Sequence, residues 1–205
     1  LVEHYDGTSW TAGGAMSTGR GAYDMGCGTQ TAAMTAGGFL PPNTANTNAT
    51  EHYNGSTWTG SGNLTDSRRN HSGCGIQTAA VTFAGDLGPS TTNQVQNYDG
   101  SSWTNVTTTP AVNVQYMAFG TQTDSVYGGG SPAATTSFKY DGTTISSGAT
   151  LATGRAQAAN AGSGTAGLFV SGWTSGPTTF TGNTEEYNKT VNTVVAAAWA
   201  SGGNL

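Results

Sequence analysis

The chain has little charge and few basic residues. Only 8% of its 205 residues are charged, and 6 Lys and Arg stand against 11 Asp and Glu, a formal net charge of -5. A nucleic-acid surface needs a basic stripe that neutralises phosphates, so this balance argues against a nucleic-acid partner. No apolar run approaches the roughly 18 residues of a membrane span, and we expect no membrane insertion. An uncharged surface of Thr, Ser, Asn and Gly favours an extracellular or virion setting.

Helix-forming patterns are also scarce. The 32 glycines and the many Thr, Ser and Asn residues are poor helix formers, and no 3.6-residue apolar period persists. Abundant glycine with low charge could indicate disorder. The aromatic residues, however, recur in register with a repeat, which disordered low-complexity chains do not show.

That repeat is the main feature of the chain. A phrase with Tyr, then Asp or Asn, then Gly, two hydroxyl residues and Trp returns about every 47 residues. Clear copies lie at residues 3–10, 51–58 and 96–103, a weaker copy lies at 138–145, and residues 185–188 open a fifth. Periodicity of this length indicates an array of identical supersecondary units.

One unit predicts four short strands. In the unit that ends near Trp58, Thr29 and Gln30 form a turn, and the prolines of residues 39–48 mark a loop. Asn54-Gly55 predicts a two-residue hairpin turn with both residues at positive φ. The expected strands cover residues 21–28, 31–36, 50–53 and 56–59.

Two further positions recur from unit to unit. Glycines align before the first turn, at Gly28, Gly75, Gly120 and Gly164. An arginine lies ten residues beyond the aromatic residue or its substitute in three units, whereas the remaining unit has Asn113 there. These arginines are Arg20, Arg68 and Arg155.

Four antiparallel strands per repeat predict an all-β fold, a β-propeller that forms one domain over residues 1–205. We expect blades over residues 15–61, 62–106, 107–148 and 149–200, the outer half of another blade over 1–14, and the start of a linker over 201–205. Two interpretations stay open. Either the chain is part of a larger array, or two more inner strands would complete a fifth blade with the N-terminal pair.

The recurring aromatic residues are expected to fill the space between blades, where they contribute large buried areas. Together with the three arginines they are interpreted as structural repeat residues. They are Tyr5, Trp10, Tyr53, Trp58, Tyr98, Trp103, Tyr140, Tyr187 and Trp199.

These residues resemble a known family. Glycines after the second strand, then Tyr, then Trp and then Arg are similar to the kelch repeat. Residues 28–33, 50–59 and 62–68 also resemble kelch-like arrays in structural proteins of marine bacteriophages, such as tail fibres and appendages. The resemblance implies a kelch-type propeller, whereas its implication for function is weaker, because such propellers include enzymes, scaffolds and lectin-like binders.

Cys27 and Cys74, the only cysteines, occupy equivalent places on the expected innermost strands of adjacent blades. The equivalent residues elsewhere are Phe119 and Ser163. Two buried free thiols are one interpretation. A disulfide is the other, and it requires Cα atoms within about 7 Å.

No catalytic, metal or cofactor site is expected. His4, His52 and His71 are scattered, and the carboxylates form no recurring acid–base pair. The kelch resemblance brings in galactose oxidase, so a propeller-borne copper oxidase is a third alternative. It would need a converging cluster of Tyr and His.

The loops after the second strand vary most between repeats and are expected on one face, where repeat proteins often bind partners. Phe39, Trp173 and Phe180 interrupt their small polar composition and are candidate binding residues. Their side chains could stack on a sugar, contact a neighbouring subunit, or cover their own blade.

The sequence therefore favours a non-enzymatic structural or adhesive propeller of a virion, such as a bacteriophage tail fibre, decoration or appendage protein. Its partners would be other virion or surface proteins, host glycans, or further copies of itself in a homo-oligomer. The alternative is a secreted or cell-surface carbohydrate-binding propeller.

If the array interpretation holds, Gly28→Val or Gly75→Val disrupts the packing of the inner strands and lowers the melting temperature far more than substitutions in residues 39–48. Thermal unfolding measures both. Equal losses from the two kinds of substitution would contradict the array.

Overall fold

The computed structural model describes residues 2–21, 25–42, 45–175 and 179–189, which form only strands and their connections. The strands are β1 Glu3–Tyr5, β2 Trp10–Ala12, β3 Met25–Thr29, β4 Ala32–Ala36, β5 Phe39–Leu40, β6 Ala45–Asn46, β7 Thr50–Tyr53, β8 Trp58–Ser61, β9 Ser72–Ile76, β10 Ala79–Asp86, β11 Thr91–Tyr98, β12 Trp103–Thr108, β13 Val114–Thr121, β14 Asp124–Ser131, β15 Ser137–Tyr140, β16 Ile145–Ser147, β17 Ala159–Gly162, β18 Ala166–Val170, β19 Trp173–Ser175, β20 Thr179–Phe180 and β21 Thr184–Asn188.

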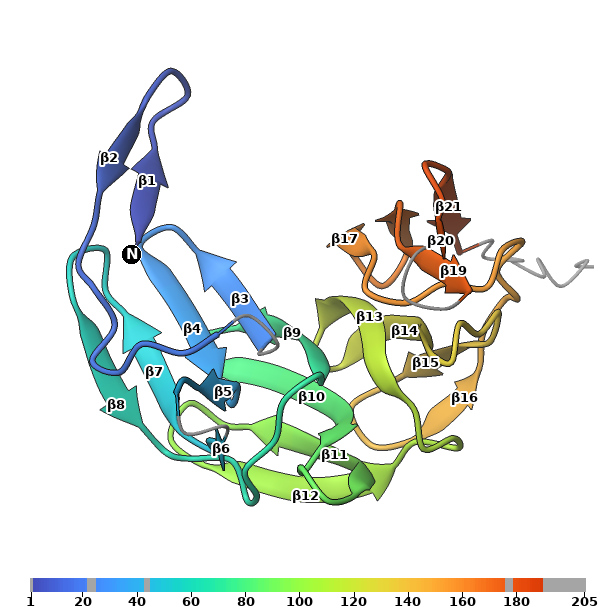
Figure 1. The fold of residues 1–205 in the computed structure, drawn as a ribbon, viewed down its shortest axis with the longest axis horizontal. Helices are drawn as coiled ribbons and strands as arrows, with labels where there is room; N and C mark the ends of the chain where they lie inside the picture. The colour runs from blue at the N-terminus through green and yellow to red at the C-terminus, as the bar shows by residue number, and fades with distance from the viewer. Residues whose placement is uncertain (1, 22–24, 43–44, 176–178, 190–205) are drawn as a thin grey trace, which may run out of the picture.

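Four antiparallel sheets are arranged in a ring and form a β-propeller, which confirms the predicted fold class. The first three blades have four strands each, in the orders β3-β4-β7-β8, β9-β10-β11-β12 and β13-β14-β15-β16. The described strands of the fourth blade are β17-β18-β21. Figure 1 shows the inner strands β3, β9, β13 and β17 following one another around the axis.

Short hairpins accompany the blades. The β1–β2 pair precedes the first blade and stands beside it in Figure 1. The β5–β6 and β19–β20 pairs lie within segments that were predicted as loops, in the first and fourth blades. In the second blade the predicted loop is short, because β10 and β11 extend to pair Asp86 with Thr91.

Strand pairing corrects the alignment of the fourth repeat by two residues. Gly28 lies opposite Ala33, and Gly120 lies opposite Ser125. The matching pair in the fourth blade is Gly162 with Gly167, so Gly162 rather than Gly164 is the equivalent glycine. It follows that Ala161, not Ser163, occupies the position of the two cysteines.

A side chain cannot be accommodated at this glycine position. Gly28 and Gly75 have φ angles of 106° and 124°, in the region that favours glycine. A Cβ atom would lie 2.2 Å from the Ala32 carbonyl oxygen at Gly28, and 2.3 Å from the Ala79 carbonyl oxygen at Gly75. Backbone strain and a backbone clash together give the physical reason for the valine prediction above.

The predicted two-residue hairpin turn is wrong. Tyr53 pairs with Trp58, so four residues form the connection, and only Gly55 has positive φ. The Asn54 side chain replaces a tighter turn, because its Oδ1 accepts hydrogen bonds from the amides of Ser56 and Thr57 at 3.0 and 2.9 Å. Asp6, Asp99 and Asp141 act in the same way, and the hydrogen bonds they accept hold the pKa of each below its usual range.

The hydrophobic core lies between the blades rather than at one centre. Three clusters of buried residues fill the three interfaces between consecutive blades. Met34 and Trp103 belong to the first interface, Phe83 and Tyr127 to the second, and Phe119 and Phe169 to the third. Each blade is therefore stable only against its neighbours, as expected for repeat folds.

The structural aromatic residues divide into buried and exposed members. Tyr53, Tyr98, Tyr140 and Trp103 are buried, and Trp58 and Tyr187 are half-buried. Trp199 lies outside the described residues.

The prediction that Trp10 lies in the core is wrong, because its side chain is 66% exposed. Tyr5, which packs against it at a ring-centroid distance of 5.1 Å, is 47% exposed. The equivalent Tyr98 and Trp103 are covered by inner strands of their own blade and by the preceding blade. Among the described residues, β1 and β2 pair only with each other, so this cover is absent there.

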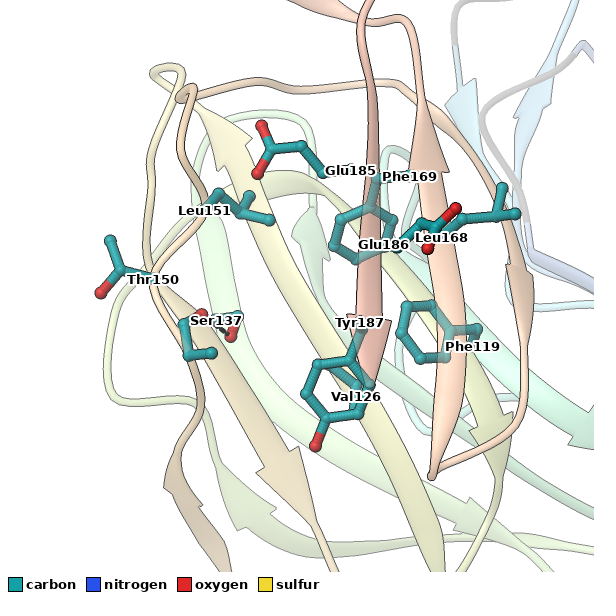
Figure 2. Close-up of a pocket in the computed structure, with 11 residues that line it drawn as sticks. Phe119, Val126, Ser137, Thr150, Leu151, Leu168, Phe169, Glu185, Glu186 and Tyr187 are labelled. Atoms are coloured by element: carbon teal, nitrogen blue, oxygen red, sulfur yellow. Dashed lines mark hydrogen bonds between the residues drawn. The ribbon is translucent and has the colours of Figure 1, made fainter. Parts of the chain in front are cut away.

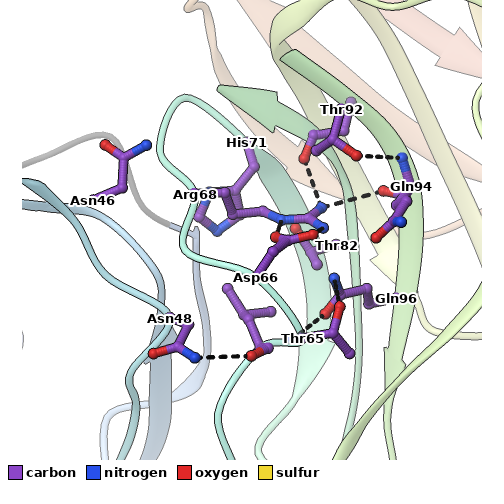
Figure 3. Close-up of polar contacts among 12 residues, drawn as sticks. Asn46, Asn48, Thr65, Asp66, Arg68, His71, Thr82, Thr92, Gln94 and Gln96 are labelled. Atoms are coloured by element: carbon purple, nitrogen blue, oxygen red, sulfur yellow. Dashed lines mark hydrogen bonds and ion pairs between the residues drawn. The ribbon is translucent and has the colours of Figure 1, made fainter. Parts of the chain in front are cut away.

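Three buried arginines hold the ends of the second strands. In the second blade, the Arg68 Nη1 donates to the carbonyl oxygens of Ala84 at 2.8 Å and Gln94 at 3.2 Å. Its other nitrogens pair with Asp66 at 2.5 and 2.7 Å, as Figure 3 shows. Ala84 has φ of 55° and lies at a bulge, where the ladder between β10 and β11 is interrupted. The guanidinium therefore satisfies carbonyl groups that the bulge leaves without strand partners.

Arg20 and Arg155 contact the equivalent carbonyl groups in their own blades, but their acidic partners lie on β7 and β21 rather than two residues before the arginine. Arg20 donates to the carbonyl oxygens of Gly37 and Ala49 and pairs with Glu51. The corresponding partners of Arg155 are Ser171, Asn183 and Glu185. The main chain of two of these arginines also links blades, because the Arg68 carbonyl accepts from the Gly38 amide and the Arg155 carbonyl accepts from the Gly130 amide, both at 2.9 Å.

The third blade replaces the charged pair by a neutral one. Asn113 stands in the position of the arginine, and Phe138 stands in the position of Glu51 and Glu185. Phe138 is buried and stacks on Tyr127 at a ring-centroid distance of 5.2 Å. A buried ion pair and a packed apolar residue thus serve as alternatives at one site.

A recurrent glutamine joins consecutive blades. The Gln77 amide nitrogen donates to the carbonyl oxygens of Ala33 and Tyr53 in the preceding blade, both at 2.9 Å. Gln122 makes the same two bonds to Ala80 and Tyr98, at 2.8 and 2.7 Å. Gln30 donates to the Tyr5 carbonyl oxygen at 2.9 Å.

We predict that Arg20 and Glu51 are strongly coupled. Arg20→Asn or Glu51→Phe alone leaves one buried charge without its partner, and each should lower the free energy of unfolding by roughly 3–5 kcal/mol. The double variant, which copies Asn113 and Phe138, should cost at least about 2 kcal/mol less than the sum of the single variants. Urea denaturation of the three variants measures this coupling, and additive losses would contradict it.

Candidate functional site

Equivalent residues of the four blades gather on one face of the propeller. Each lies at the end of a second strand or shortly after it, and pairs with the residue after the arginine position, as in Gly21 with Phe39 and Ala156 with Trp173. In the second and third blades the pairs are Arg69 with Asp86 and Val114 with Ser131. We call the face marked by these four positions the axial face. It carries the loops that the sequence predicted as binding surface. These loops begin at Phe39, Asp86, Ser131 and Trp173.

A cavity of about 480 Å³ opens at the centre of the ring. First strands of all four blades, with the residues just before them, provide its walls. None of the described lining residues carries a charge at neutral pH. They are Met25, Gly26, Asn70, His71, Ser72, Gly73, Gln115, Tyr116, Gln157 and Asn160. We call this space the axial cavity.

Three amide residues occupy equivalent positions around the axial cavity. Asn70, Gln115 and Gln157 each lie two residues after the arginine position, with φ of 53°, 60° and 53°. Their main chains are hydrogen-bonded in series. The backbone N–H of Gln115 donates to the backbone carbonyl of Asn70 at 2.7 Å, and the backbone N–H of Gln157 donates to the backbone carbonyl of Gln115 at 3.4 Å. Residues other than glycine in this region cost about 1–3 kcal/mol each and cluster at functional sites. Sequence reasoning missed this set, although the constant offset from the arginine could have indicated it.

His71 is buried beside the axial cavity in its neutral form. Burial, reinforced by the positive charge of Arg68, lowers the pKa of His71 to about 3. Its Nε2 lies 3.0 Å from the Ala36 carbonyl oxygen, so this nitrogen carries the proton and donates. Nδ1 is then an acceptor, and it is buried with no partner among the described residues, as is Oδ1 of Asn70.

Of the three predicted binding residues, Phe39 contacts the next blade. The Arg69 guanidinium lies 5.1 Å from the centre of the Phe39 ring and pairs with Asp86 at 2.9 Å. Asn46 of the same β5–β6 hairpin donates to the Asp86 carbonyl oxygen at 2.8 Å. Phe39 therefore belongs to the contacts between the first and second blades.

Trp173 and Phe180 lie together on the fourth blade. They are cross-strand partners in the β19–β20 hairpin. Trp173 is half-buried, whereas Phe180 is 68% exposed, the largest exposed fraction among the large hydrophobic side chains of the described residues. A cavity of about 350 Å³ lies between this pair and Gln157, with Val170 and Ser171 in its wall. We call it the aromatic groove, and Gln157 also lines the axial cavity.

A further cavity lies between the third and fourth blades, as Figure 2 shows. Its volume is about 60 Å³, which has room for a few water molecules only. Phe119, Phe169 and Tyr187 border it, and Glu185 at its rim is already bound to Arg155. We interpret this space as imperfect packing between blades rather than a ligand site.

Cys27 and Cys74 are free thiols, so the structure does not form the disulfide that was one of the two interpretations. Burial raises the pKa of both to about 12. The Cys74 thiol donates weakly to the Thr121 carbonyl oxygen at 3.8 Å. Both thiols are therefore protonated and poorly reactive at neutral pH.

The remaining histidines connect neighbouring units. His4 Nε2 lies 2.6 Å from the Tyr53 hydroxyl, and His52 Nε2 lies 3.1 Å from that of Tyr98. Within the described ranges, no three His, Cys, Asp or Glu side chains gather closely enough to bind a metal ion. The same residues include no helix with the length and hydropathy to span a lipid bilayer.

Comparison with protein-family models finds none that matches the chain, and comparison with curated proteins also finds no match.

His71 should make stability depend on pH between about 5 and 7. The folded state keeps His71 neutral down to about pH 3, whereas the unfolded chain takes up a proton near pH 6.5. Stability is therefore full above pH 6.5 and falls as the pH is lowered, by about 2 kcal/mol at pH 5. Burial also lowers the pKa of His52, which acts in the same direction.

Urea denaturation at several pH values measures this slope. His71→Gln can keep the bond to Ala36 without titrating, so it should flatten most of the slope above pH 5. An unchanged slope in this variant would contradict the assignment.

Proposed function

We propose that this chain is a non-enzymatic structural or adhesive propeller of the kelch type, displayed on the outside of a virion. In this proposal the axial face contacts a host surface or a neighbouring virion protein. The observation that carries it is the pair of Trp173 and Phe180, which presents an apolar surface on the axial face. Other residues make the contacts between blades, so this pair is available to a partner.

The axial face separates variable side chains from a repeated backbone. Its four equivalent positions hold Phe39, Asp86, Ser131 and Trp173, which differ in size, charge and polarity. The residue before each has φ between 100° and 130°, so the backbone is similar in all four blades. A fixed backbone with varied side chains supports recognition, because it presents different chemistry without an ordering cost.

The kelch type is supported by what the repeated residues do. The arginine of the repeat binds the glycine-containing bulge after the second strand, and the Tyr and Trp of the repeat pack across β7–β8 and β11–β12 at 5.0 and 4.9 Å. These are the residues on which the resemblance rests. The virion setting is supported by the resemblance of residues 28–33 and 50–59 to bacteriophage arrays and by the low surface charge.

The aromatic groove also favours a second candidate, a secreted or cell-surface carbohydrate-binding propeller. Exposed aromatic rings beside amide side chains suit the apolar faces and hydroxyls of sugars. The two candidates share the axial face and differ in the particle that carries it.

Density-gradient fractionation of the source material distinguishes the settings. Fractions are searched by mass spectrometry for peptides of this chain. We expect them to band with intact particles. Peptides confined to the soluble fractions would contradict the virion setting and favour the secreted propeller.

Adhesion through the axial face is tested separately with the purified chain on beads. Beads should retain particles or cells from the same source, and Phe180→Ala should abolish most of this retention. Ile76→Ala is a matched control. Ile76 is 54% exposed and lies at the end of β9, the first strand of the second blade, that is remote from the axial face. Equal retention by both variants, or equal loss, would contradict the assignment of the face.

A further inference from the structure

We propose that the axial cavity and the aromatic groove together bind a neutral oligosaccharide, with one sugar ring in the axial cavity and the next against Phe180. This inference rests on the proposed adhesive function and adds the class of ligand and its orientation. The two spaces are adjacent because Gln157 lines both of them.

The size of the axial cavity suits a sugar ring. Its volume of about 480 Å³ lies within the range of small-molecule sites, which is about 300–1,000 Å³. The aromatic groove adds about 350 Å³. The two volumes fit consecutive rings of a chain better than one compact ligand.

The polar groups around the axial cavity match hydroxyl groups. The described residues provide no hydrogen-bond partner for the side-chain amides of Gln115, Gln157 and Asn160. Each amide can donate to one hydroxyl and accept from its neighbour, which suits vicinal hydroxyls of a pyranose.

Two acceptors strengthen this match. Oδ1 of Asn70 and Nδ1 of His71 are buried and have no partner among the described residues, although buried acceptors are usually satisfied. Both residues line the axial cavity. A hydroxyl is a neutral donor, whereas a phosphate or a carboxylate would present further acceptors to them.

The charges near the site favour a neutral ligand. No described lining residue of either space is charged, and the buried arginines are already occupied by carbonyl and carboxylate oxygens. An anionic sugar would therefore lose its hydration without gaining a cation.

The aromatic groove provides the apolar contact. Phe180 exposes most of its ring beside the half-buried Trp173, and the two are cross-strand partners. A sugar presents C–H groups on one face and hydroxyls at its edge. With its apolar face on Phe180, its edge would reach the amide of Gln157.

The test is titration of the complete chain with neutral trisaccharides, namely maltotriose, cellotriose, mannotriose and tri-N-acetylchitotriose, followed by NMR. Sialyllactose serves as the anionic comparison. We expect saturable binding of at least one neutral trisaccharide. Phe180→Ala and Gln157→Gly should each weaken it by about tenfold or more, whereas Ile76→Ala should leave it unchanged.

Gln157→Gly removes the amide without adding strain, because glycine readily adopts the φ of 53° at this position. Thermal unfolding of each variant confirms that it is folded. Binding of sialyllactose alone, binding that neither variant weakens, or no binding of any trisaccharide up to about 10 mM would overturn the inference.

The outcome separates this inference from the adhesive function. If Phe180→Ala abolishes retention on beads but no neutral trisaccharide binds or competes, adhesion stands and the sugar ligand is wrong. If trisaccharides bind but beads retain neither particles nor cells, the ligand stands and the adhesive function is wrong.

Discussion

In three of the four blades a buried guanidinium contacts the carbonyl groups at the end of the second strand, and the architecture of those blades depends on this contact. The left-handed residues of the bulge interrupt the strand ladder and leave carbonyl groups that need donors. Arg68 supplies them, and its own carbonyl accepts from the preceding blade. The residue that follows the bulge then lies on the axial face, and the residue two places after the arginine lies on the axis. One side chain thus positions both parts of the candidate site.

The fold could be predicted because its signals are local. Glycines at fixed spacing, turn residues and aromatic pairs identify four strands per repeat without knowledge of their neighbours. The errors occurred where local patterns compete or where neighbours decide. The Asn54 side chain replaced a two-residue turn. The fourth blade has two nearby glycines, Gly162 and Gly164, and only the strand pairing identifies Gly162 as the equivalent one. Trp10 is exposed because burial of this side chain requires neighbouring strands, and among the described residues β1 and β2 pair only with each other. Asn70, Gln115 and Gln157 looked ordinary, since their meaning arises only when four first strands converge.

Stability and recognition use different chemical groups in this molecule. The arginines and the inter-blade glutamines bind mainly backbone carbonyl oxygens, which every residue supplies whatever its side chain. Substitution at an axial-face position such as Ser131 or Trp173 therefore leaves these contacts unchanged, whereas Phe39 also packs against Arg69 of the next blade. The third blade goes further, because it has Asn113 and Phe138 instead of the ion pair, while Gly129 and Gly130 keep the positive φ of the equivalent residues in the other blades. Such tolerance lets the exposed positions differ from blade to blade.

The inter-blade glutamine also gives the array a direction. Gln77 and Gln122 each reach backward to the blade before them, so every interface joins the front of one blade to the back of another. Interfaces of this head-to-tail kind do not limit the number of units through their chemistry. What limits the number is the rotation from each blade to the next. Side chains that alter this rotation, such as Met34 or Phe119 between the blades, would decide whether successive units curve into a closed disc or rise as a spiral.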